Sequence, residues 1–210
     1  MTDNYHKITE YFKSFKLLPA HKDEQNDYFF SVRIIRRGKD YPDLPSANLT
    51  YATYYFTNFE KFARFESDIK KLCDVLGCRA YVSTTLYSCE KLIKQINLSA
   101  ATRINIGDNK SPWSIVEHSA DVMPVKLRRW VVDMDDVEEG SDKVIQMCDI
   151  IRSCDCGVKD PITFLNKTRS GVHIITHPFN LKQFTGNLSA LGIEAPEIKK
   201  NHITLLYENL

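Results

Sequence analysis

The stretch RWVVDMDDVEEGSDKVIQMCDIIR, residues 129–152, changes from the hydrophobic pattern of a strand to that of a helix. Its apolar, β-branched beginning predicts a strand over residues 129–135. The apolar side chains after the acidic turn recur at helical spacing and predict a helix over residues 141–152, with Val144, Met147, Cys148 and Ile151 on its buried face.

The rest of the second half continues this alternation. Strands are predicted over residues 162–165, 172–176 and 202–207, and a helix over residues 180–191. The resulting order, β-α-β-β-α-β, is that of the split arrangement in ferredoxin-like domains. We therefore expect a ferredoxin/RRM-like lobe over residues 129–210.

The first half also predicts mixed structure. The expected strands are residues 28–35, 50–56 and 78–86, and the expected helices are an opening helix that ends before Pro19, residues 59–76, and about 88–101. Thr57 and Glu60 form a capping-box signature at the start of the second helix, and Gly77 marks its end. Residues 1–101 therefore predict an N-terminal αβ lobe.

A connecting segment is expected over residues 102–128, because it contains Gly107, Pro112 and Pro124 and little sustained periodicity. The predicted fold class is α+β, with the two lobes around a cleft.

Composition sets limits on the function. The chain has 28 Lys plus Arg and 27 Asp plus Glu, a net charge of +1, so binding to nucleic acid has to rely on local basic clusters. No apolar run is long enough to span a membrane, and the first residues do not have the pattern of a signal peptide, so we expect a cytoplasmic protein without a membrane partner. The six cysteines lack paired CxxC spacing and are expected to be buried thiols; zinc bound by Cys148, Cys154 and Cys156 is the less favoured alternative.

Asp133 and Asp135 end the strand of residues 129–135. The strand period of two sends both carboxylates to one face, where they repel each other unless a divalent cation lies between them. This pattern predicts a catalytic site for Mg²⁺ or Mn²⁺, and the alternative is a solvated strand end.

A basic turn with glycine follows between two predicted strands. Lys167 and Arg169 have the charge to neutralise a triphosphate, Gly171 allows close approach of the backbone, and His173 can donate a hydrogen bond to a phosphate oxygen. Ser170 lies in the same turn. The alternative is that His173 is a structural histidine that supports the turn.

Basic and aromatic residues of the first half are candidates for contact with nucleic acid. They are Arg36, Arg37 and Lys39 after one strand, and Arg79 and Tyr81 on one face of another. Such side chains bind a template backbone and stack a base, although a solvated basic turn is the simpler interpretation. Lys199 and Lys200 are a further possible phosphate contact.

The order of these segments resembles the catalytic core of archaeo-eukaryotic-type primases and primase-polymerases, in which an acidic motif, a helix and a Ser-x-His-like motif follow one another. The resemblance implies metal binding by Asp133 and Asp135, and binding of nucleotide phosphates by Ser170, Gly171 and His173. It also implies nucleoside triphosphates and a single-stranded template as partners. The chain is similar as well to a family of phage and prophage proteins with RRGKD-like, RAYV-like, VDMDD and SGVHIITHPF segments, over roughly residues 30 to 207.

The sequence departs from the primase pattern in two respects. The spacing from Ser170 to His173 is one residue longer than usual, and the third acidic residue has only weak candidates, Glu194, Glu197 and Glu208. Three alternatives follow: a non-catalytic nucleic-acid-binding or replication accessory protein with this fold, a metal-dependent nuclease, and a two-histidine phosphoesterase using the motif His202-Ile203-Thr204.

Overall fold

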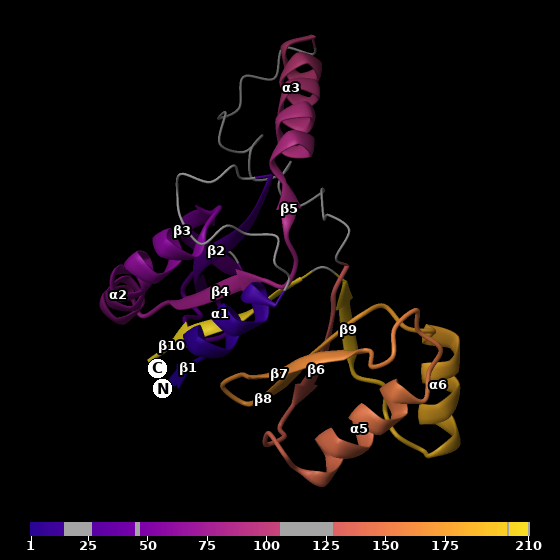
Figure 1. Ribbon diagram of the computed structural model, residues 1–210. Helices are drawn as coiled ribbons and strands as arrows, with labels where there is room; N and C mark the ends of the chain where they lie inside the picture. Colours follow the sequence, from indigo (N-terminus) through magenta and orange to yellow (C-terminus); the bar gives the residue numbers. More distant parts are fainter. Residues whose placement is uncertain (15–26, 45–46, 106–127, 201, 210) are drawn as a thin grey trace.

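The computed structural model describes residues 1–14, 27–44, 47–105, 128–200 and 202–209. These residues form an α+β fold, as predicted, with helices packed against two antiparallel sheets (Figure 1). The predicted connecting segment falls largely within residues 106–127, which lie outside the described residues.

The first sheet combines strands from both ends of the chain. Its order is β1 (Thr2–Asp3), β10 (Ile203–Glu208), β4 (Arg79–Ser83), β2 (Tyr28–Arg37) and β3 (Asn48–Phe56), and β5 (Tyr87–Ser88) also pairs with β2. One face packs against α1 (Tyr5–Lys13) and α2 (Phe59–Leu76). Phe12 of α1 and Phe62 of α2 are fully buried against Phe30 of β2, and such burial of aromatic rings stabilises the lobe.

The second sheet has the order β7 (Ile162–Lys167), β8 (Gly171–Thr176), β6 (Trp130–Asp135) and β9 (Glu197–Lys200). The helices α5 (Asp142–Arg152) and α6 (Leu181–Ala190) bury apolar side chains in the core of this sheet, where Val132 and Met134 of β6 meet Met147 and Phe184. Figure 1 shows both helices beside this sheet.

The last strand lies in a different place from the one predicted. The expected strand over residues 202–207 forms as β10, but it pairs with β1 and β4 of the first sheet. The fourth strand of the second sheet is β9, which the hydrophobic pattern did not predict. Because β9 has the sequence Glu-Ile-Lys-Lys, it lacks the apolar residues that mark a strand, and it forms through backbone pairing with β6.

Polar side chains connect the two sheets directly. Asn166 of β7 donates to the backbone oxygen of Leu205 and to the hydroxyl of Thr204, both at 2.7 Å. Asn4 donates to the backbone oxygen of Lys167 at 2.9 Å. Because Asn166 and Thr204 are fully buried, these hydrogen bonds hold β7 against β10 in a fixed register.

Smaller differences from the predictions concern the ends of elements. Asn58, rather than Thr57, caps α2, because the Asn58 side chain accepts a hydrogen bond from the backbone of Lys61. The predicted end of α2 is confirmed, since Gly77 follows Leu76 in the left-handed conformation at φ 57°. α3 (Cys89–Asn105) extends beyond the predicted helix and projects from the rest of the described residues (Figure 1). None of the described helices combines the length and apolar character that crossing a membrane requires.

Candidate functional site

The alternation of β6 places its two acidic side chains on one face. Val132 and Met134 point into the core beneath α5 and α6, and the intervening Asp133 and Asp135 point to the opposite face. Both carboxylates line a cavity of about 300 Å³ to which both sheets contribute. The sequence-based expectation that the two acids share a face therefore agrees with this geometry.

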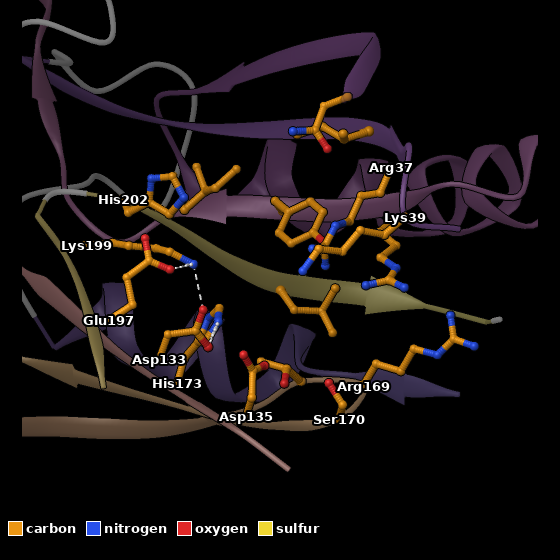
Figure 2. A pocket seen from close by; sticks show the side chains of 17 residues that line it. Arg37, Lys39, Asp133, Asp135, Arg169, Ser170, His173, Glu197, Lys199 and His202 are labelled. Carbon is orange, nitrogen blue, oxygen red and sulfur yellow. Dashed lines mark hydrogen bonds and ion pairs between the residues drawn. The ribbon is translucent and has the colours of Figure 1, made fainter. Parts of the chain in front are cut away.

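The cavity combines clusters of opposite charge (Figure 2). Its acidic residues come from β6 and β9 of the second sheet: Asp133, Asp135 and Glu197. Basic residues come from both sheets and from the turns beside them: Arg37, Lys39, Arg79, Arg169 and Lys199. Such a mixture is suited to a ligand that is anionic at one end and binds a cation at the other.

Asp133 has a charged or polar partner at each carboxylate oxygen. Its Oδ2 lies 2.6 Å from the Nζ of Lys199, and its Oδ1 lies 3.2 Å from the Nε2 of His173. Lys199 also lies 3.1 Å from Glu197. Figure 2 shows the Lys199 ammonium between the two carboxylates, so the acidic cluster is held together by a positive charge of this chain.

His173 is oriented from the other sheet. Its ring Nδ1 lies 2.8 Å from the hydroxyl of Thr204 in β10, which itself accepts a hydrogen bond from Asn166. The second ring nitrogen faces Asp133, and the histidine is 8% exposed. Both nitrogens are therefore engaged with the protein, and His173 fixes the position of Asp133 in this conformation.

The partners of Asp133 keep it ionised. Burial by itself raises the pKa of the Asp133 carboxyl, but the hydrogen bonds and charges of His173 and Lys199 outweigh burial and hold this pKa well below its usual range. Burial likewise lowers the pKa of Lys199, but its contacts with Asp133 and Glu197 raise it above its ordinary value. Near neutral pH the pair is therefore an anion and a cation.

Most of the residues predicted from the sequence line this cavity. They are Asp133, Asp135 and His173 of the acidic site, Arg169 and Ser170 of the basic turn, and Arg37, Lys39, Arg79 and Tyr81 of the first sheet and its turn. The cavity thus brings together segments that are distant in the sequence.

Three residues of the main predicted sites lie outside this cavity, as do the weaker candidates Lys200, Glu194 and Glu208. Arg36 points to the opposite side of β2, where its guanidinium donates to the backbone oxygen of Leu76 at the end of α2 and lies over the ring of Tyr41. Lys167 lines a separate depression beside Glu138 and Glu139. Gly171 packs against the backbone of Met134. A side chain at this position would collide with β6, so the close approach of β8 and β6 requires glycine here.

Several residues of the cavity were not predicted as site residues, because they depend on the tertiary structure. Asn48 and His202 line it, and Thr204 orients His173. The sequence had named His202 and Thr204 only in the alternative phosphoesterase motif. Glu197 and Lys199 were weak candidates in the sequence. Their spacing of two was a usable signal, since in a strand it places both side chains on one face.

Arg79 and Arg169 meet at one carboxylate near the edge of the cavity. Asp40, in the turn after β2, lies 2.8 Å from Arg79 and 3.2 Å from Arg169. Arg79 also lies 3.0 Å from the buried Glu208, an ion pair whose angle is not that of a hydrogen bond. Asp40 thus neutralises part of the positive charge that faces the cavity.

This arrangement predicts that Asp40→Asn strengthens anion binding. Without the carboxylate, Arg79 and Arg169 have more of their positive charge available, and we expect the affinity for inorganic triphosphate to rise about threefold to tenfold. Isothermal titration calorimetry at low salt measures this effect. Asp43→Asn is the control, because Asp43 is exposed in the same turn and does not line the cavity. Unchanged affinity in Asp40→Asn contradicts the prediction.

The cysteines form no zinc site among the described residues. Cys148 and Cys154 are buried, and the thiols of Cys154 and Cys156 donate to backbone oxygens of Ile150 and Val158. Across the described ranges, no group of three His, Cys, Asp or Glu side chains is arranged to hold a metal ion, and at Asp133 the positive charge comes from Lys199.

The chain was also compared with known proteins. No protein-family model, curated protein or solved structure matches it. The function is therefore argued from the site itself.

Proposed function

We propose that this protein is a metal-dependent nucleotidyltransferase of the primase or primase-polymerase type, which acts on nucleic acid and nucleoside triphosphates. The observation that carries the proposal is the cavity in which Asp133, Asp135 and Glu197 lie opposite Arg37, Lys39 and Arg169. Transfer of a nucleotidyl group needs carboxylates for divalent ions and cations for a triphosphate within one site.

The topology supports this proposal. The strand order β7-β8-β6-β9, joined through α5 and α6, is the order of a ferredoxin-like lobe, with β9 in place of the strand expected at residues 202–207. In this proposal the two sheets are two lobes around a cleft, and the first of them includes β10 as well as the strands of the N-terminal half. This arrangement is consistent with the resemblance to primases that the acidic and Ser-x-x-His motifs suggest.

The chemistry of the carboxylates suits Mg²⁺ or Mn²⁺, although in the described residues they are not arranged around a metal position while Lys199 contacts Asp133 and Glu197. Both ions prefer carboxylate oxygens, and Asp133 and Asp135 supply them from one strand. Glu197, which pairs with Asp133 across β6 and β9, is our candidate for the third carboxylate. A bound divalent ion lowers the pKa of an attacking hydroxyl and neutralises charge on the leaving pyrophosphate.

The other residues of the cavity have complementary roles in this proposal. Arg169, Ser170 and Lys39 bind the triphosphate, and His173 positions Asp133. Arg37, Arg79 and Tyr81 form the wall contributed by the first sheet, where a template strand binds through its phosphates and a stacked base.

The first test measures binding of labelled nucleoside triphosphate in the presence of Mn²⁺. Replacing Asp133 and Asp135 together by asparagine is expected to weaken this binding at least tenfold, equivalent to about 1.4 kcal/mol, because the ligands of the metal are lost. Asp68→Asn with Asp149→Asn is the control: both carboxylates are exposed, lie outside the cavity and give the same change in net charge.

Catalysis is tested next with primers on single-stranded templates. Extension that needs Mn²⁺, nucleotides and both aspartates supports the proposal. Loss of full-length oligonucleotide without nucleotides indicates a nuclease. Salt-dependent binding of nucleic acid that is unchanged in the aspartate variant, without extension, favours the non-catalytic accessory protein.

A further inference from the structure

Lys199 lies among the carboxylates that are proposed to bind a metal ion. Its ammonium lies 2.6 Å from Asp133 and 3.1 Å from Glu197, so one lysine bridges two of the three carboxylates of the cavity. The register explains this contact. Asp133 pairs with Glu197 across β6 and β9, and Lys199 follows two residues later on the same face of β9.

The ammonium competes with any divalent ion for the same oxygen atoms. The Oδ2 of Asp133 is engaged by Lys199, and the Oδ1 faces His173. A divalent ion held by Asp133 and Glu197 has to lie close to where the ammonium lies now, and two positive charges at that distance repel strongly. Lysine can leave without a change in the backbone, because its four-carbon side chain is flexible.

The same cavity supplies a second place for this charge. Lys39 and Arg169 face it from the turns, and His202 lies beside Lys199 (Figure 2). A triphosphate bound there brings phosphate oxygens into the cavity that contains Lys199. An ammonium displaced from the carboxylates then has anionic partners within the same site.

We propose that Lys199 is an internal counter-ion that Mn²⁺ or Mg²⁺ bound to a nucleoside triphosphate displaces, and that its ammonium then binds the phosphates. This inference rests on the proposed nucleotide site and adds a nucleotide-binding residue to it. A metal ion alone is repelled by the ammonium of Lys199, and a nucleotide alone is repelled by the carboxylates. Each ligand therefore binds weakly by itself. Each then increases the affinity for the other by the same factor.

The test measures Mn²⁺ binding by electron paramagnetic resonance and ATP binding by calorimetry, each with and without the other ligand. In the wild-type protein, ATP is expected to raise the affinity for Mn²⁺ at least tenfold. In Lys199→Gln, the affinity for Mn²⁺ alone rises at least fivefold, whereas the affinity for ATP alone falls at least fivefold. Opposite changes follow from the loss of a positive charge in any case; transfer of the ammonium predicts in addition that ATP raises the Mn²⁺ affinity of Lys199→Gln by a smaller factor than that of the wild type.

Two further variants serve as controls. Lys200→Gln removes the neighbouring charge. Lys200 was a possible phosphate contact in the sequence, but its ammonium lies 5.2 Å from the centre of the Trp130 ring and outside the cavity, so this variant is expected to change neither affinity. Lys199→Arg keeps the positive charge and is expected to keep the low affinity for Mn²⁺ alone. Thermal unfolding of each variant shows whether the fold is retained.

The inference fails if folded Lys199→Gln binds Mn²⁺ no better than the wild type, or if it binds both ligands more weakly. If the asparagine variant of Asp133 and Asp135 still loses Mn²⁺-dependent nucleotide binding in that case, the proposed function stands without this role for Lys199. If that variant binds nucleotide as the wild type does, the proposed function itself fails.

Discussion

Arg79→Met is expected to lower the free energy of unfolding by about 3 to 5 kcal/mol. Arg79 is 6% exposed and its partner Glu208 is 2% exposed, with 3.0 Å between Nε and Oε2. Methionine fills much of the same volume but leaves the carboxylate of Glu208 buried without a cation. Removing one partner of a buried pair is costly for this reason, even where the pair itself contributes little.

Urea unfolding followed by circular dichroism measures this loss. Arg64→Met is the matched control, because Arg64 pairs with Glu60 on the exposed surface of α2, and we expect a change within about 0.5 kcal/mol. The double variant Arg79→Met with Glu208→Met is expected to recover most of the lost stability, since no charge of the pair remains buried. If the double variant is less stable than Arg79→Met, the explanation is wrong.

The hydrophobic pattern predicted the helices that border the site with useful accuracy. Val144, Met147 and Ile151 repeat at helical spacing because one face of α5 is buried, and Gly77 ends α2 where the sequence indicates. Asp133 and Asp135 were placed on one face by the period of a strand. These features depend on neighbouring residues, which a sequence displays directly.

Pairing between distant strands was not predictable in the same way. The pattern of Ile203 to Tyr207 identifies a strand but contains no information on its partner, and β10 joins β1 and β4. β9 contains two lysines and a glutamate around one isoleucine, so its formation depends on the free edge of β6 rather than on burial.

The contacts within the site also depend on the pairing of distant strands. Thr204 reaches His173 over a separation of 31 residues, and Lys199 reaches Asp133 over 66. Such contacts exist only once the strands are paired. The residue types therefore suggested an acidic and a basic cluster, whereas the tertiary structure determines that Lys199 and His173 contact the two carboxylate oxygens of Asp133.

Gly171→Ala is expected to lower the free energy of unfolding by about 3 kcal/mol. A Cβ at this position would lie 2.0 Å from the carbonyl oxygen of Met134 and 3.1 Å from the Cα of Asp135. Both are backbone atoms of the neighbouring strand, which cannot move aside as a flexible side chain does. The strands β6 and β8 have to separate at the point where Gly171 pairs with Asp135.

The same displacement reaches the proposed site. Asp135 and Ser170 lie on either side of this contact and both line the cavity, so Mn²⁺-dependent binding of nucleotide is expected to weaken together with stability. Gly157→Ala and Gly186→Ala are the controls, because a Cβ at either position meets no atom within 4 Å. Gly186 lies inside α6, where alanine is the better helix former, and there we expect a gain of up to about 1 kcal/mol. Urea unfolding of the three variants measures the expected loss of stability in Gly171→Ala and the expected gain in Gly186→Ala. Equal stability of Gly171→Ala and the wild type would show that β6 and β8 tolerate a wider separation than this packing implies.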